Sequence, residues 1–211
     1  IFSVKNALDY LGVENKLTAD KNEICAADEI ILPGVGAFPW AMKMLRDSGL
    51  VDTIREEARK KPFLGICLGM QLEAIKYARE HKIPMFGICL GMQLIFDKGY
   101  EFEETDGLRL IGGKVEKIDR KDMIIPHMGW NELEINRDCP ILKGIPEHPY
   151  VYFVHSYAAV CDEANVSAYC DYGGKITALV HDGAYVYGAQ FHPEKSGEVG
   201  LQMLRNFAEL A

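Results

Sequence analysis

The chain has 211 residues and a formal net charge of -8, and hydrophobic residues make up 48% of it. This length fits one domain with a sizeable apolar core. The negative charge argues against nucleic acid and anionic membrane surfaces as partners. No apolar run is long enough to predict a membrane span, and the first residues lack the pattern of a secretory signal.

The first half of the sequence alternates helical and strand patterns. Val4, Ala7 and Leu11 recur with helical spacing, and Gly12 can end that helix. Helices alternating with buried strands predict an α/β fold, in which a doubly wound, mostly parallel sheet has helices on both faces. The predicted elements of this half are helices over 4–11, 40–60 (with a break at 48–49) and 73–82, and strands over 29–32, 62–66 and 84–88.

The second half is richer in short β patterns, which are separated by glycines, prolines and acidic residues. Leu201, Leu204 and Phe207 share one face of a closing helix. No linker divides the halves, so we expect a single domain over residues 1–211 with a β-rich, mixed or antiparallel C-terminal half. The predicted elements here are strands over 108–118, 151–157, 166–170, 176–181 and 185–191 and a helix over 197–210.

Eight letters, GICLGMQL, occur twice at a spacing of 22 residues, within 63–72 and within 85–94. Each copy is a short apolar run that enters Gly-x-Cys-x-Gly and continues into a helix-forming stretch. This is the pattern of a nucleophile elbow with a thiol in place of the hydroxyl, and the helix dipole there favours a thiolate. The repeat predicts a thiol-dependent acyl-transfer enzyme with Cys67 or Cys89 as the nucleophile. A buried structural cysteine in a glycine-rich turn is the alternative for each copy.

The cysteines as a set indicate a reducing compartment. None of them forms a C-x-x-C pair or a zinc spacing with a histidine. Without an export signal, reduced thiols in the cytoplasm are expected. The six are Cys25, Cys67, Cys89, Cys139, Cys161 and Cys170.

A candidate general base lies in the segment QFHPE over 190–194. His192 follows a predicted strand, and the Glu194 carboxylate two residues later can orient its ring. Pro193 fixes the backbone between the two. For this segment alone, a partly buried histidine beside a solvated glutamate is the simpler interpretation. Combined with a cysteine elbow, the order Cys, His, Glu forms a candidate catalytic triad.

The turn Pro33-Gly-Val-Gly36 follows the predicted strand over 29–32. The backbone N–H groups of Gly34, Val35 and Gly36 can serve as an oxyanion hole. Taken alone the signal is weak, because most such turns only connect elements.

These three segments, in this order, resemble the class I glutamine amidotransferases, the triad glutaminases, over nearly the whole chain. Two further segments, PHMGWN over 126–131 and YFVHSY over 152–157, narrow the resemblance to the glutaminase subunits of imidazole glycerol phosphate synthases. The related glutaminases of anthranilate, purine and pyridoxal phosphate synthesis carry different sequences at these places.

The resemblance implies a role for each segment. Cys67 or Cys89 would attack glutamine, His192 would act as the base, and Glu194 would orient it. When the resemblance is left aside, core packing is the simpler interpretation of Trp130 and Tyr152. The remaining implied roles are glutamine binding by Gln71 or Gln93 and by the backbone around His155, Ser156 and Tyr157, and contact with the synthase partner by Met128 and Trp130.

The implied activity is hydrolysis of glutamine to glutamate and ammonia through a cysteine thioester. The ammonia would pass to a (β/α)8-barrel cyclase subunit, and the heterodimer, a lyase of histidine biosynthesis, would make imidazole glycerol phosphate. No metal or organic cofactor is implied. Two alternatives are a stand-alone thiol hydrolase of γ-glutamyl peptides and an inactive or binding-only remnant of such a subunit.

The sequence departs from the family pattern in two ways. It opens partway into the family's first helix, without the opening strand and its glycine loop, which suggests a fragmentary sequence. It also carries the duplication. Deleting residues 73–94 or 63–84 leaves a continuous family pattern, and 73–93 resembles the corresponding stretch of CTP synthase glutaminases.

The choice between the two cysteines depends on which strand borders the oxyanion turn. The strand over 62–66 follows the strand over 29–32 by one helical crossover, which predicts that Cys67 lies beside the turn. If 84–88 takes the next position in the sheet, Cys89 lies a further strand spacing of about 4.8 Å away. In the other arrangement 84–88 replaces 62–66 in the sheet and residues 63–83 bulge outward. The spacing favours Cys67 and leaves Cys89 open.

Overall fold

The computed structural model describes residues 2–33, 47–57, 61, 63–66 and 83–210. Within these residues one mixed sheet has the strand order β1-β2-β3-β13-β12-β11-β8. Neighbours from β1 to β13 are parallel, and neighbours from β13 to β8 are antiparallel. The predicted α/β fold is therefore confirmed, and the antiparallel extension belongs to the same sheet. Its strands are β1 (Ile30–Pro33), β2 (Phe63–Ile66), β3 (Met85–Ile88), β8 (Glu134–Ile135), β11 (Val166–Asp171), β12 (Lys175–His181) and β13 (Val186–Ala189).

The strands of the two copies lie side by side in this sheet. β2 and β3 are parallel and in matched register, with Gly65 opposite Gly87 and Ile66 opposite Ile88. The other neighbour of β2 is β1, and the other neighbour of β3 is β13. The arrangement in which the strand segment of the first copy leaves the sheet is therefore wrong.

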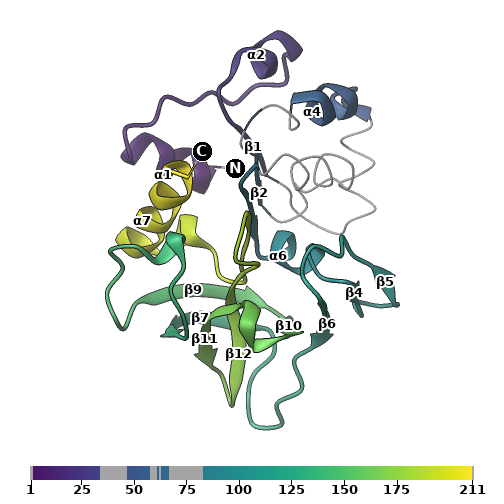
Figure 1. The fold of residues 1–211 in the computed structure, drawn as a ribbon, viewed down its shortest axis with the longest axis vertical. Coiled ribbons are helices and arrows are strands. Elements are labelled where there is room, and N and C mark those ends of the chain that lie inside the picture. The colour runs from purple at the N-terminus through teal and green to yellow at the C-terminus, as the bar shows by residue number, and fades with distance from the viewer. Residues whose placement is uncertain (1, 34–46, 58–60, 62, 67–82, 211) are drawn as a thin grey trace.

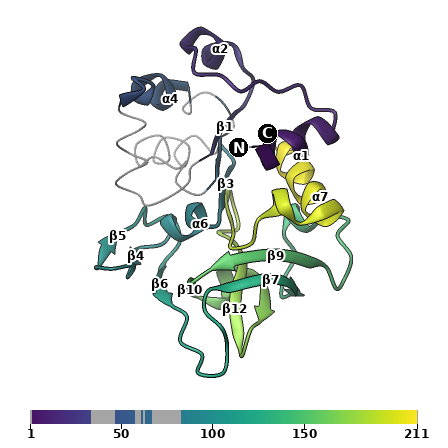
Figure 2. The same cartoon turned by 180° about the vertical axis from the view of Figure 1, so that it is seen from behind.

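Helices cover both faces of the parallel strands. Figures 1 and 2 show α1 and α7 on one side and α4 and α6 on the other. Because side chains alternate along a strand, Phe86 and Ile88 join the apolar cluster of α1 and α7, while Met85 joins that of α6. The helices are α1 (Phe2–Tyr10), α2 (Lys21–Ala26), α4 (Val51–Glu57), α6 (Leu90–Leu94) and α7 (Gly197–Ala208).

Several predicted elements have the expected limits, and others differ. Gly12 follows α1 with φ +70°, and Gly49 has φ +68° at the predicted break before α4. The predicted strand over 108–118 is shorter, because only β6 (Gly113–Lys117) forms there. Helix α2 was not predicted; it begins after Asp20, whose side chain accepts hydrogen bonds from two backbone N–H groups of its first turn. The predicted helices over 40–46 and 73–82 lie outside the described residues.

Two smaller sheets complete the β-rich half. β7 pairs antiparallel with β9, so the PHMGWN and YFVHSY segments meet, with His127 opposite His155 and Trp130 opposite Tyr152. The predicted strand over 151–157 divides near Ser156 into β9 and β10, which belong to different sheets. The strands of these sheets are β7 (His127–Glu132) with β9 (Tyr150–His155), and β4 (Lys98–Gly99), β5 (Thr105–Asp106), β6 and β10 (Tyr157–Cys161).

The described residues also include three short 3-10 helices, η1 (Pro140–Leu142), η2 (Glu163–Asn165) and η3 (Pro193–Lys195). In the described part of the chain, no helix combines the length and apolar character that crossing a bilayer requires.

Candidate active site

Cys89 occupies a strained turn between β3 and α6. Its backbone angles are φ 56° and ψ -111°, a region that residues with a side chain rarely adopt. Its N–H donates to the Ala189 carbonyl oxygen at 2.7 Å, which ties the turn to the end of β13. A cysteine held in strain between a parallel strand and a helix has the geometry of a nucleophile elbow.

The glycines around Cys89 permit this turn. A Cβ atom on Gly87 would lie 2.6 Å from the backbone carbonyl of Gly91 and 2.8 Å from the backbone nitrogen of Met92. Any side chain at this position would push α6 away from β3. The first glycine of Gly-x-Cys-x-Gly is therefore required by the close approach of the helix backbone to the strand.

Amide groups from three segments meet beside the Cys89 thiol. The Gln190 side-chain nitrogen lies 3.8 Å from Cys89 Sγ, and Gln190 is fully buried. Gln93 Nε2 donates to Gln190 Oε1 at 2.9 Å and to the Tyr157 carbonyl oxygen at 3.1 Å. The predicted glutamine-binding residues Gln93 and Tyr157 thus lie together. Gln190 was not predicted, although its position two residues before His192 was a signal for it.

His192 and Glu194 form the contact that the sequence indicated. The His192 Nδ1 and Glu194 Oε1 atoms are 2.7 Å apart, and the two side chains are only 7% and 4% exposed. The backbone between them is held in place, because His192 N–H donates to the Tyr152 carbonyl oxygen and Ser196 Oγ donates to the His192 carbonyl oxygen. The solvated-glutamate interpretation of this segment is therefore wrong. With Nδ1 engaged, Nε2 is the ring nitrogen available for proton transfer.

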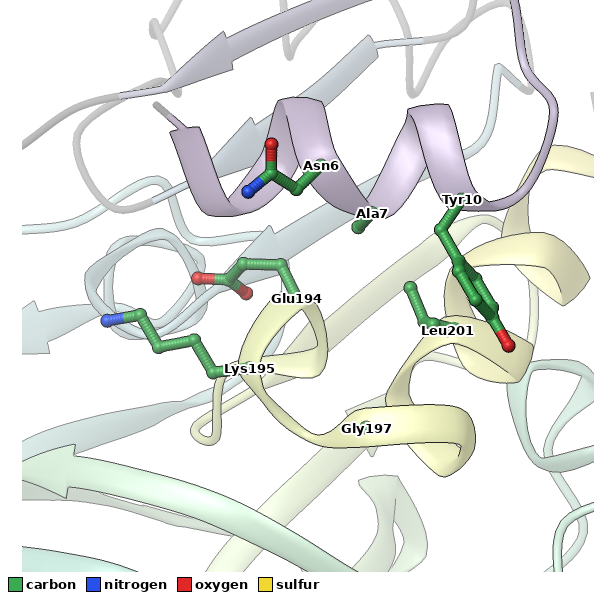
Figure 3. Close-up of a pocket in the computed structure, with 7 residues that line it drawn as sticks. All are labelled: Asn6, Ala7, Tyr10, Glu194, Lys195, Gly197 and Leu201. Carbon is green, nitrogen blue, oxygen red and sulfur yellow. The ribbon is translucent and has the colours of Figure 1, made fainter.

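The second Glu194 oxygen, Oε2, takes no part in this contact. Oε2 is buried and has no hydrogen-bond partner among the residues that the structure describes. A cavity of about 410 Å³ between α1, η3 and α7 has Glu194 among its lining residues. Figure 3 shows Glu194 and Lys195 of η3 beneath Asn6 of α1. The cavity is lined by Asn6, Ala7, Tyr10, Glu194, Lys195, Gly197 and Leu201.

The predicted partner-facing residues lie on the exposed face of β7. Met128 is 60% exposed and Trp130 is 53% exposed, so core packing does not account for them. The Trp130 ring meets Tyr152 edge-on at a centroid distance of 6.1 Å. The Lys195 ammonium lies 5.9 Å from the centre of the same Tyr152 ring, which is within cation–π range. These contacts connect the β7 face to η3, the element that carries Glu194.

Several predicted site residues lie outside the described part of the chain: Cys67, Gln71 and the oxyanion residues Gly34, Val35 and Gly36. Their strands are described. β1 ends at Pro33 directly opposite Ile66, the last residue of β2, and the predicted oxyanion turn and first elbow are the segments that come next in the sequence. Among the described residues, no group of three or more His, Cys, Asp or Glu side chains is placed to hold a metal ion.

Comparison with known proteins gives a consistent result. The family model for glutamine amidotransferase class-I matches residues 3–75 and, separately, 72–210. Each of the two matched segments contains one copy of the repeat. The chain is 43% identical over 210 residues to the imidazole glycerol phosphate synthase subunit HisH of Listeria monocytogenes, covering 99% of the chain and 89% of the relative. It is 43% identical over 208 residues to the HisH subunit of Bacillus cereus, covering 98% and 88%.

Solved structures agree on the fold. A glutamine amidotransferase crystal structure matches with a TM-score of 0.61 at 22% identity, covering 99% of this chain and 92% of the other. The glutaminase domain of Trypanosoma brucei CTPS with bound acivicin matches with a TM-score of 0.56 at 16% identity, covering 99% and 88%. The fold, the cysteine elbow with its histidine–glutamate pair, and the relatives over nearly the full length lead to one conclusion: this chain belongs to the class I glutamine amidotransferase family and is related within it to the HisH subunits.

Proposed function

We propose that this chain is a glutaminase, one domain over residues 1–211, that hydrolyses glutamine to glutamate and ammonia through a thioester on Cys89. The observation that carries the proposal is the pairing of β3 with β13. This pairing joins the strained Cys89 elbow to the strand that leads into the buried His192–Glu194 pair. A nucleophile and a base oriented by a third group form the arrangement that activates a thiol.

The reaction follows from these groups. The Cys89 thiolate attacks the side-chain amide carbon of glutamine, and the C–N bond breaks as His192 gives a proton to the leaving nitrogen. Ammonia departs and a γ-glutamyl thioester remains on sulfur. His192 then takes a proton from water, whose oxygen attacks the thioester carbon and releases glutamate and the thiol. Glu194 holds the ring in the orientation that both steps require.

The strand order supports Cys89 over Cys67 as the nucleophile. β3 separates β2 from β13, so Cys89 follows the strand that borders the histidine, and Cys67 follows a strand one position further away. The expectation for Cys67 rested on the oxyanion turn, which follows β1 beside β2. Activation of the thiol requires an imidazole within hydrogen-bond reach. The position next to the strand that leads to His192 therefore favours Cys89.

The relation to HisH subunits extends the proposal to a partner. We propose that the ammonia passes to a (β/α)8-barrel cyclase subunit, which uses it to make imidazole glycerol phosphate in histidine biosynthesis. The assembly would be a cytoplasmic heterodimer with lyase activity. The exposed apolar face of β7, with Met128 and Trp130, supports a docking surface near the site, because large apolar side chains at such exposure are typical of interfaces.

The test combines covalent labelling with a rate measurement. The chain is treated with acivicin, an electrophilic glutamine analogue, with and without the barrel cyclase subunit, and the modified cysteine is mapped by peptide mass. Glutamate release is measured in the same two samples. We expect labelling of Cys89 and stimulation by the cyclase. Labelling of Cys67 alone would move the nucleophile to the first copy. Hydrolysis of γ-glutamyl peptides without stimulation would indicate a stand-alone hydrolase, and the absence of both labelling and turnover would refute the proposal.

A further inference from the structure

A network of hydrogen bonds joins β7 and β9 to the backbone carbonyl of Tyr157, which also accepts from Gln93. His155 Nδ1 lies 2.8 Å from the Tyr157 carbonyl oxygen, and His155 Nε2 lies 3.0 Å from His127 Nδ1. His127 Nε2 lies 2.8 Å from Asn131 Oδ1, and the Asn131 amide nitrogen donates to the Asp171 carbonyl oxygen at 3.2 Å. The network therefore joins the strand that carries the exposed Trp130 to the backbone beside Gln93.

The two imidazoles are held rigidly inside the protein. His127 is 0% exposed and His155 is 6% exposed. The His127 ring is stacked between Tyr172 at 3.9 Å and Phe153 at 4.7 Å, with interplanar angles of 20° in both cases. Burial lowers the pKa of His127 and lowers the pKa of His155 to about 4. Near pH 7 both rings are neutral, and each carries one proton.

The number of ring protons limits how many of these contacts can be hydrogen bonds donated by a histidine. Three contacts of this hydrogen-bond network involve a ring nitrogen: Tyr157 with His155, His155 with His127, and His127 with Asn131. Two neutral rings supply only two N–H groups for these three contacts. A proton on His155 Nδ1 fills the link to Tyr157, and a proton on His127 Nδ1 fills the link between the rings. The link without a ring proton is then the one between His127 Nε2 and Asn131, which is less buried than the two histidines. In this arrangement the Asn131 amide turns so that its N–H faces His127 Nε2, and the hydrogen bond from Asn131 to the Asp171 carbonyl oxygen is given up.

The Tyr157 carbonyl is the functional end of this network. It accepts from His155 and also from Gln93 Nε2, whose amide extends to Gln190 beside Cys89. We propose that His155 and His127 are positioning residues of the glutaminase site, which hold the Tyr157 carbonyl oxygen in place for Gln93 from the partner-facing strand β7. This inference rests on the proposed function. It assigns the two side chains a role in binding glutamine and none in the bond-breaking steps.

The first test compares two replacements of His155. His155→Leu removes the donor to Tyr157, and His155→Asn keeps an N–H near the place of Nδ1. With the cyclase subunit present, we expect His155→Leu to raise KM for glutamine about 5- to 10-fold, the effect of one lost hydrogen bond, with kcat nearly unchanged. His155→Asn should restore most of the affinity. His127→Phe keeps the ring stack and should raise KM by a smaller factor, about 3-fold.

The control applies the same change to an exposed histidine. His148 has a side chain that is 72% exposed, and its contact is to Glu132, so His148→Leu should leave KM at the wild-type value. Equal KM values for wild type and His155→Leu would overturn the positioning role. If His155→Leu and His155→Asn raise KM equally, the positioning role is also overturned. The weaker binding of glutamine would then come from lost packing and not from the lost hydrogen bond. An inactive wild type would instead refute the proposed function.

A second readout does not depend on activity. Nitrogen NMR of histidines labelled with ¹⁵N in the ring reports which nitrogen of each ring carries the proton. We expect the proton on Nδ1 of both His155 and His127 near pH 7, with the His127 pattern disturbed in Asn131→Asp. A proton on Nε2 of His155 would leave the Tyr157 carbonyl without this donor and would overturn the inference even in an active enzyme.

Discussion

The two copies of the repeat have the same letters and different neighbours. β2 lies between β3 and β1, and β1 leads into the predicted oxyanion turn. β3 lies between β2 and β13, and β13 leads to His192. The strand before the first elbow therefore pairs with the strand that leads into the predicted oxyanion turn, and the strand before the second elbow pairs with the strand that leads to the predicted base. A motif in a parallel sheet acquires its chemistry from the adjacent strands, and this chain presents one motif in two such settings.

Removing each thiol should give the largest difference between the copies. We expect Cys89→Ala to lower kcat for glutamine hydrolysis by at least about 10³-fold, because the variant lacks the thiol that forms the thioester in the proposed reaction. Cys67→Ala should retain most of the wild-type rate. Glutamate release in the presence of the cyclase subunit measures both. The reverse ranking of the two variants would assign the chemistry to the first copy.

Removing one copy would abolish the difference altogether. Deleting residues 67–88 joins Ile66 to Cys89, which leaves a single elbow bordered by both β1 and β13. The oxyanion turn and the histidine would then flank the same thiol, and we expect kcat/KM to rise about 10²-fold, the usual effect of an oxyanion donor. Steady-state kinetics with the cyclase subunit provide the measurement. A folded deletion variant without any gain would show that the extra strand does not separate the catalytic groups.

A matched pair of glycine substitutions compares the packing of the two elbows. Gly87→Ala places a Cβ 2.6 Å from the Gly91 backbone, and since neither backbone segment can move easily, the free energy of unfolding should fall by about 3 kcal/mol. Gly65→Ala makes the same change at the aligned position of β2. Denaturant unfolding measures both losses. Equal losses would mean that both elbows pack alike, and no loss in Gly87→Ala would contradict the close approach described for α6.

Acid should weaken the half of the molecule that contains the buried histidines. Burial lowers the pKa of His155 from 6.5 to about 4, and it lowers the pKa of His127 and His181. Between pH 6.5 and pH 4, His155 binds a proton in the unfolded chain and not in the folded chain. The free energy of unfolding is therefore lost as the pH falls from about 6.5 toward 4. From pH 7 to pH 5, His155 alone should lower the free energy of unfolding by about 2 kcal/mol.

Denaturant unfolding at pH 7 and pH 5 tests this expectation. His155→Asn should show a smaller loss on acidification than wild type, because asparagine does not titrate. A wild-type stability that is the same at both pH values would contradict a buried neutral His155.

Much of the fold and part of the site could be predicted from the sequence, for local reasons. Helical spacing placed α1 and α7, and Pro193 made the approach of His192 and Glu194 predictable because it restricts the short backbone between them. The strand β7 was missed because its pattern is inverted: the polar His127 is buried, while Met128 and Trp130 are exposed. Its contacts with His155, and those of Gln93 with Gln190, join residues 28 and 97 positions apart, which periodicity cannot reveal.

The register between β2 and β3 has a consequence for how such a sheet can grow. Gly65 stands opposite Gly87 and Ile66 opposite Ile88, so the backbones of the two strands are paired without a shift in register. A duplication that is longer or shorter by one residue within the strand would direct its apolar side chains to the wrong helical layer. A parallel sheet can therefore accept a duplicated segment that consists of one whole strand and its connection. A duplication that shifts the register of the strand would disrupt the core and would not extend the sheet.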